Sequence, residues 1–199
     1  KVLVPVHLCG QPCDMKKIRK LCNKYGVKII EDASHAIGGS YQGAPIGNCK
    51  YSDITVFSFH PVKIVTTAEG GAALTNDHEL AKKMNLYRSH GITRDHDQMT
   101  EAAHGPWYYQ QIALGYNYRM TELQAALGIS QMTRLTEFVA TRHKIAERYN
   151  SLLTNLPVTT PFQLEGTHSG LHLYVIRLHL DQISATHKEG FDELRVNQI

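Results

Sequence analysis

The segment Val27-Lys28-Ile29-Ile30-Glu31-Asp32 is the most informative part of this 199-residue chain for its architecture. Its β-branched residues favour a strand, and the two acidic residues mark where that strand ends. Before it, residues 15–22 carry apolar side chains at helical spacing, and Gly26 ends this helix. Residues 2–8 are apolar and β-rich, which predicts a strand buried on both faces. A strand, a helix and a second strand in this order predict a right-handed crossover in a parallel sheet.

The following residues continue this alternation of strands and helices. Residues 53–59 and 72–75 predict two further strands, and Asn76 or Asp77 is placed to cap a helix that runs to about Arg88. Residues 89–115 then predict one long loop, rich in His, Asp and Gln. Loops of this length in compact domains are usually functional or disordered.

The second half of the chain is more helical. We expect a capped helix from Thr121 and a second helix over residues 139–153, followed by a proline-containing linker. Residues 171–180 alternate between apolar and polar side chains, which predicts a half-solvated strand, and a last helix begins near Ala185. The pattern therefore predicts an α/β unit, then a helical bridge, then the start of a smaller α+β unit.

The composition is that of an ordinary globular protein, with 42% hydrophobic and 20% charged residues. The net charge of +3 is spread along the chain and indicates no nucleic-acid partner. No apolar run approaches the ~20 residues that span a bilayer, so we expect no membrane association and a cytoplasmic location. Both ends resemble cuts inside structured segments, and we expect the chain to be a fragment of a longer protein.

The four cysteines show no C-x-x-C spacing. A zinc site built from His7, Cys9 and Cys13 is one interpretation, but free buried or half-buried thiols are the better one. We therefore expect no metal site.

The candidate chemistry lies in polar residues that follow predicted strands, since open α/β sheets bind ligands at the carboxyl ends of their strands. Asp32 follows the apolar strand, although it could equally cap a turn. Lys63 is a lone lysine among apolar neighbours and a candidate for a desolvated amine that forms a Schiff base, although a surface lysine is the safer interpretation of this residue alone. Together with Ser58, these residues meet the needs of pyridoxal phosphate: a carboxylate for the pyridine nitrogen, an amine for the aldehyde and a hydroxyl for the phosphate.

Four motifs then occur in register along the chain. They are residues 31–36 (EDASHA), 58–63 (SFHPVK), 67–71 (TAEGG) and 115–126 (GYNYRMTELQAA). This set resembles the pyridoxal-phosphate-dependent sugar aminotransferases of the DegT/DnrJ/EryC1/StrS family. The resemblance implies the aspartate-aminotransferase-like α/β fold, here incomplete. Residues 1–138 would form the C-terminal part of the large three-layer α/β/α cofactor domain, and residues 139–199 a bridging helix and the beginning of the small domain.

The resemblance also implies roles for residues of the cofactor site. Lys63 would bind pyridoxal 5'-phosphate covalently and carry the catalytic proton transfer, and Asp32 would pair with the pyridine nitrogen. His35 would lie near the phenolic oxygen of the cofactor, and Ser58 would bind its phosphate.

Two further residues receive roles through the same resemblance. Asn117 would reach the phosphate of the neighbouring subunit's cofactor, which implies a homodimer with shared active sites. His60 would face the substrate, although a packed histidine is nearly as good an interpretation.

Within the family, the loop residues 88–95 and 105–111 resemble the C4 transaminases of pseudaminic acid biosynthesis. This implies transfer of an amino group from glutamate to a UDP-linked 4-keto-6-deoxy-N-acetylhexosamine. Two alternatives remain open: a family member that acts on another nucleotide-linked keto-sugar, and a truncated, cofactor-free chain that serves as a dimerisation scaffold.

Overall fold

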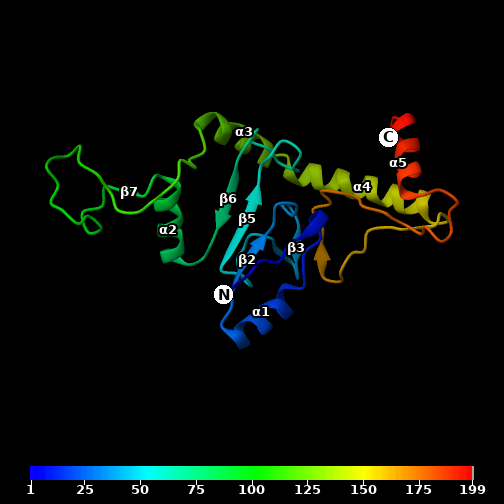
Figure 1. Ribbon diagram of the computed structural model, residues 1–199, viewed down its shortest axis with the longest axis horizontal. Coiled ribbons are helices and arrows are strands. Elements are labelled where there is room, and N and C mark those ends of the chain that lie inside the picture. Colours follow the sequence, from blue (N-terminus) through cyan, green and yellow to red (C-terminus); the bar gives the residue numbers. More distant parts are fainter. Residues whose placement is uncertain (199) are drawn as a thin grey trace.

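A four-stranded sheet forms the centre of the computed structural model, which describes residues 1–198 (Figure 1). Its strands are β1 (Val2–Leu3), β2 (Lys28–Asp32), β5 (Ile54–Ser58) and β6 (Gly71–Leu74), and they lie side by side in this order. The first three strands run parallel, and β6 pairs antiparallel with β5. The predicted α/β class and the parallel core are confirmed.

The helix α1 (Met15–Tyr25) connects β1 to β2 as the sequence predicts. It begins because the Asp14 carboxylate accepts a hydrogen bond from the backbone N–H of Lys17, which satisfies one of the free donors of the first turn. It ends at Gly26, which adopts a left-handed conformation with φ of 61°.

The prediction of a doubly buried strand over residues 2–8 is wrong. Only Val2–Leu3 form a strand; Val6 adds a single bridge to Asp32, and the chain then enters the 3₁₀ turn η1 (Leu8–Gly10). The side chains of residues 2, 3, 4 and 6 are 40–55% exposed. They are exposed because β1 is an edge strand in residues 1–198, paired with β2 alone.

Two hydrophobic clusters hold the sheet. The first joins the sheet to the long helix α4 (Leu135–Leu153). Its buried members are Ala33, Ala36, Ile37, Phe57, Ile64, Val65 and Val139. The second packs α1 on β2 through Met15, Cys22 and Ile29, with Tyr41 beside them. Burial of these side chains supplies the main stabilisation of the α/β unit.

Beyond β6, the predicted helix is α2 (His78–Arg88), which is capped by Asp77. The predicted loop over residues 89–115 is a hairpin at its base, because β7 (Ile92–Thr93) pairs antiparallel with β8 (Gln110–Gln111). Figure 1 shows that this hairpin extends away from the body of the protein.

The expected helices of the second half are present. Thr121 forms a capping box at the start of α3 (Glu122–Met132), and α4 follows directly. The last helix, α5 (His187–Val196), begins after Thr186. The predicted domain boundary at 138/139 falls inside α4 and remains a prediction.

The prediction of one half-solvated strand over residues 171–180 is wrong. Only β11 (Arg177–Leu178) is a strand, and it pairs antiparallel with β9 (Val158–Thr159). Residues 170–173 instead bind the turn η1: Gly170 N–H donates to the carbonyl of Gly10, and Leu173 N–H to that of Cys9. Because these hydrogen bonds lead to a turn rather than to a strand, the alternation of buried and exposed side chains is lost, and both Leu171 and His172 are buried.

The segment that follows β2 forms a small separate sheet. Strand β3 (Ser40–Tyr41) pairs with β4 (Ala44–Pro45) on one side and with β10 (Thr167–His168) on the other. This sheet brings the chain around residue 168 back to the end of β2. Among residues 1–198, no helix has the length and apolarity needed to cross a bilayer.

Candidate active site

The candidate site lies at the carboxyl end of two neighbouring parallel strands. Asp32 is the last residue of β2, and Ser58 is the last residue of β5. Asp32 is paired in register with Val56, so both strand ends reach the same edge of the sheet. This is the edge at which open α/β sheets place ligand-binding groups.

Asp32 is half-buried and carries an ionised carboxylate at neutral pH. Its Oδ1 accepts a hydrogen bond of 3.0 Å from the backbone N–H of Ser34. Burial opposes ionisation, but hydrogen bonding from Ser34 and the nearby His35 and Lys63 outweigh it, so the pKa of Asp32 lies below its ordinary value. The carboxylate is therefore suited to pair with a protonated ring nitrogen.

Lys63 lies in the loop that joins β5 to β6. The loop is closed by a hydrogen bond from Phe59 N–H to the carbonyl of Gly70 (2.8 Å), and the Lys63 N–H donates to the carbonyl of His60 (2.9 Å). The next two residues, Ile64 and Val65, are buried in the core and anchor this turn. Lys63 is thereby half-buried and close enough to shift the pKa values of Asp32 and of His35.

His35 lies three residues beyond Asp32, against the turn η1. Its Nδ1 accepts a hydrogen bond of 3.2 Å from the backbone N–H of Cys9. Burial and the positive charge of Lys63 lower the pKa of His35, and Asp32 offsets this only in part. His35 is therefore neutral near pH 7.

The structure adds a residue that the sequence prediction missed. His172, 8% exposed, packs its ring against His35 with the ring centroids 4.5 Å apart. Burial, followed by the electrostatic effects of His35, Lys63 and Arg142, lowers the pKa of His172 to about 4. The alternating pattern of residues 171–180 predicted a strand and gave no reason to single out His172. Gly170, just before this segment, was the one sequence signal against a regular strand.

The remaining predicted residues make contacts of their own. The hydroxyl of Ser58 accepts a hydrogen bond from His60 N–H (3.4 Å), while the His60 ring is half exposed and lies 4.0 Å from Glu69. Asn117 is exposed and forms a bridge with Ser89, at the end of α2. The structure thus brings Asp32, His35 and Lys63 together, whereas Asn117 contacts the end of α2.

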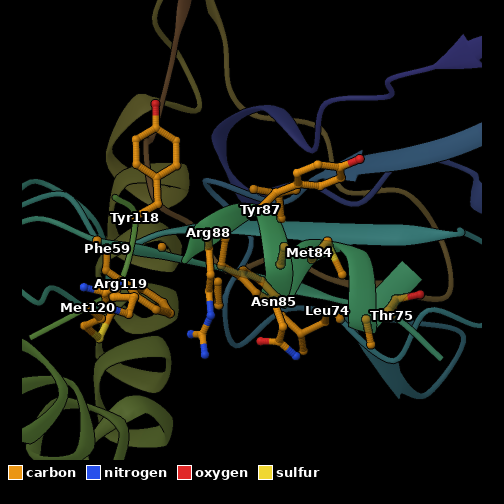
Figure 2. Close-up of a pocket in the computed structure, with 18 of the residues that line it drawn as sticks. Phe59, Leu74, Thr75, Met84, Asn85, Tyr87, Arg88, Tyr118, Arg119 and Met120 are labelled. Carbon is orange, nitrogen blue, oxygen red and sulfur yellow. The ribbon is translucent and has the colours of Figure 1, made fainter. Parts of the chain in front are cut away.

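A large groove lies apart from this group of residues. It measures about 1250 Å³ and lies between β6, α2 and the segment before α3. Figure 2 shows Met84 and Arg88 entering it from α2, and Arg119 and Met120 from the segment before α3. The candidate site residues Asp32, His35, Ser58 and Lys63 do not line it. Phe57 and Phe59, which flank Ser58 in sequence, are among the residues that line the groove.

The zinc interpretation of the cysteines does not fit the geometry. Nδ1 of the fully buried His7 accepts from Cys13 N–H (3.1 Å), and its Nε2 lies 2.8 Å from Glu31 Oε2. Both ring nitrogens are therefore engaged by protein groups. No group of three or more possible ligands gathers in the part of the chain that the structure describes, and the four cysteines are free thiols.

The group of residues at the sheet edge suits pyridoxal phosphate by its donor set. An ionised carboxylate, a neutral histidine and a half-buried lysine meet within mutual electrostatic range, and a serine hydroxyl lies at the adjacent strand end. Fold and site together define a protein of the pyridoxal-phosphate-dependent transferase class.

The chain belongs to the DegT/DnrJ/EryC1/StrS aminotransferase family, whose sequence model matches residues 1–198. Pyridoxal phosphate is the cofactor of this family. The fold class and family expected from the four motifs are confirmed.

Similar proteins are about twice as long. A UDP-4-amino-4,6-dideoxy-N-acetyl-beta-L-altrosamine transaminase of Helicobacter pylori is 36% identical over 90% of this chain and 45% of its own length. A GDP-perosamine synthase of Caulobacter vibrioides is 39% identical over 89% of this chain and 45% of its own. The solved structure of Helicobacter pylori PseC, an aminotransferase of pseudaminic acid biosynthesis, superposes with a TM-score of 0.86 at 33% identity, over 98% of this chain and 49% of its own. The chain thus spans about half the length of these relatives.

Proposed function

We propose that the protein to which this chain belongs is a pyridoxal-phosphate-dependent aminotransferase that transfers an amino group to the keto group of a nucleotide-linked sugar. The observation that carries the proposal is the meeting of Asp32, His35 and Lys63 at the carboxyl edge of β2 and β5. Asp32 and Lys63, 31 residues apart in sequence, reach one place because the parallel pairing of β2 and β5 aligns the ends of these strands.

When bound, pyridoxal phosphate supplies the electron sink on which amino-group transfer depends. Lys63 Nζ would hold the cofactor covalently and later move the proton from the α-carbon of the amino donor. The ionised carboxylate of Asp32 would hold the proton on the pyridine nitrogen. His35 would donate to the phenolic oxygen, and the Ser58 hydroxyl to the phosphate.

For the substrate, we propose a UDP-linked 4-keto-6-deoxy-N-acetylhexosamine, with glutamate as amino donor. The similarity to the Helicobacter pylori transaminase supports this choice. The Caulobacter vibrioides relative, a GDP-perosamine synthase at comparable identity, favours another nucleotide-linked keto-sugar as the second candidate. Amino transfer to a panel of UDP-, GDP- and dTDP-linked keto-sugars, measured on the whole protein, distinguishes the two.

We propose a homodimer in which Asn117 reaches the cofactor of the neighbouring subunit and His60 faces the substrate. Large apolar side chains that are solvent-exposed near Asn117 support a partner at this surface: Tyr118 is 74% exposed, Leu123 85% and Ile129 70%. A cytoplasmic location fits the four free thiols. We also propose that residues 1–138 belong to the cofactor domain and residues 139–199 to the bridging helix and the start of the small domain.

Covalent trapping tests the cofactor role of Lys63. The chain is incubated with pyridoxal phosphate, reduced with borohydride and digested, and the labelled peptide is identified by mass spectrometry. We expect the label on Lys63 and its loss in Lys63→Arg, while Lys82→Arg, a change of an exposed lysine in α2, keeps it. A label on other lysines only would contradict the site. Absence of any label, with no absorption band of bound cofactor, would instead support the cofactor-free scaffold.

A further inference from the structure

The proton of the neutral His35 ring is on Nε2. Nδ1 of His35 accepts the hydrogen bond from Cys9 N–H at 3.2 Å, and a ring nitrogen that accepts a hydrogen bond carries no proton. Cys9 makes this contact from a left-handed conformation with φ of 60°, which is uncommon for a residue other than glycine. Such a conformation persists only where the surrounding structure imposes it.

The surrounding structure at this point includes His172. Its segment is held to the Cys9 turn by two backbone hydrogen bonds, from Gly170 N–H to Gly10 (3.1 Å) and from Leu173 N–H to Cys9 (3.3 Å). On the other side, Arg142 Nη1 donates to the carbonyls of residues 171 and 172, both at 3.1 Å. The backbone on both sides of His172 is therefore fixed.

The ring of His172 acts on His35 by packing rather than by a hydrogen bond. The two rings are tilted by 47°, and Nδ1 of His172 is buried without a hydrogen-bond partner among the described residues. A buried ring nitrogen without an acceptor is least costly as a bare lone pair, so the His172 ring is neutral. A charged His172 would add a second positive charge beside Lys63.

We propose that His172 is a positioning residue, which holds the ring of His35 against the Cys9 amide and so presents His35 as a neutral Nε2–H donor beside Asp32 and Lys63. That this donor serves a bound cofactor rests on the proposed function. The orientation itself is a property of the chain alone. The charged groups that act on His35 are Lys63 and Asp32, while His35, Lys63 and Arg142 act on His172.

Nuclear magnetic resonance of the histidine side-chain nitrogens tests the inference without cofactor. The chain is labelled with ¹⁵N-histidine, and His35 is assigned from the signals that disappear in His35→Asn. We expect wild-type His35 to show a bare Nδ1 and a protonated Nε2, with a titration midpoint below 6.5. A proton on Nδ1 of His35 in the wild-type chain overturns the inference, whatever the variants do.

Three variants separate positioning from a general loss of structure, with the fold checked by circular dichroism. His172→Ala removes the ring, and we expect His35 to populate both tautomers and its titration midpoint to rise toward 6.5. His172→Phe keeps an aromatic ring where no hydrogen bond is lost, and we expect it to restore the wild-type His35 signals. His168→Ala disrupts the other packed histidine pair, whose ring centroids lie 4.1 Å apart, and should leave His35 unchanged.

Unchanged His35 signals in folded His172→Ala overturn the inference, as does failure of folded His172→Phe to restore them. If His172→Ala does not fold, the spectra of the wild-type chain and of His172→Phe still test whether His35 is held with its proton on Nε2. The trapping experiment at Lys63 can contradict the proposed function while these spectra support the role of His172, and the spectra can contradict that role while trapping succeeds. The two proposals are therefore tested independently.

Discussion

Gly10→Ala is the sharpest test of how the candidate site is assembled. Gly10 has a φ of +99°, and a Cβ added there would lie 2.7 Å from the backbone nitrogen of Leu171 and 2.9 Å from the carbonyl oxygen of His35. Both are backbone atoms, so relief requires a whole segment to move. Three segments distant in sequence meet at this glycine.

The cost of this substitution has separate physical sources. A non-glycine residue in the left-handed region costs about 1–2 kcal/mol, and forcing extra volume into a packed site costs about 1–3 kcal/mol. Moving residues 170–173 away also breaks the hydrogen bond from Gly170 to Gly10, worth about 1 kcal/mol. We expect a loss of roughly 4 kcal/mol in unfolding free energy, which lowers Tm by roughly 8–16 °C for a chain of this size.

Thermal unfolding followed by circular dichroism measures this effect against two matched glycines. Gly43 also has a positive φ (+76°), but a Cβ there meets nothing within 4 Å among the described residues, so Gly43→Ala should cost the backbone strain of about 1–2 kcal/mol alone. Gly190 lies in α5, where an added Cβ meets nothing within 4 Å in residues 1–198, and Gly190→Ala should stabilise the helix by up to about 1 kcal/mol. If Gly10→Ala lowers Tm no more than Gly43→Ala, the close approach of residues 10, 35 and 171 is refuted.

Two further substitutions test the sheet and a helix cap. The Asp53 carboxylate accepts hydrogen bonds from Ile29 N–H (2.8 Å), Arg19 (3.1 Å) and Lys28 (3.1 Å), so Asp53→Asn should cost about 2 kcal/mol at pH 7 in urea unfolding. Burial opposes the ionisation of Asp53, but these donors outweigh it and lower its pKa below the ordinary 3.8. The carboxylate therefore contributes its full stabilisation above pH 3.8, and this is lost as the pH falls through the lower pKa of the folded state. The unfolding free energies of wild type and variant should consequently converge in acid. Convergence at high pH instead would contradict this assignment. Thr121→Ala removes the capping box of α3 and should cost about 1 kcal/mol by the same assay, whereas Thr136→Ala, at an exposed position within α4, should cost less; equal losses would show that the cap contributes nothing special.

Much of the fold was predictable because its signals are local. Asp77 and Thr121 cap helices where the sequence places a cap, and Gly26 ends α1 as expected. The proximity of Asp32 and Lys63 was predictable for a related reason, since both follow parallel strands that are joined within a short stretch of chain.

The segment around His172 was not predictable in this way. Its alternating residues match a strand, but its hydrogen bonds lead to the Cys9–Gly10 turn, 160 and 164 residues earlier, a contact that no local pattern reports. The prediction of a buried strand over residues 2–8 was wrong for another reason. An apolar run shows that a strand could be buried on both faces, but it does not show whether another segment covers those faces.

The buried pair of His7 and Glu31 contributes to the alignment of the first strand, beside the backbone hydrogen bonds between the two segments. The ladder of β1 is only two residues long, and such a short edge ladder specifies its register weakly. A slip by one residue would separate the His7 ring from Glu31 and leave a carboxylate that is 4% exposed without its partner. The penalty for an unpaired buried charge is several kcal/mol, so one polar pair makes every shifted pairing of these strands unfavourable.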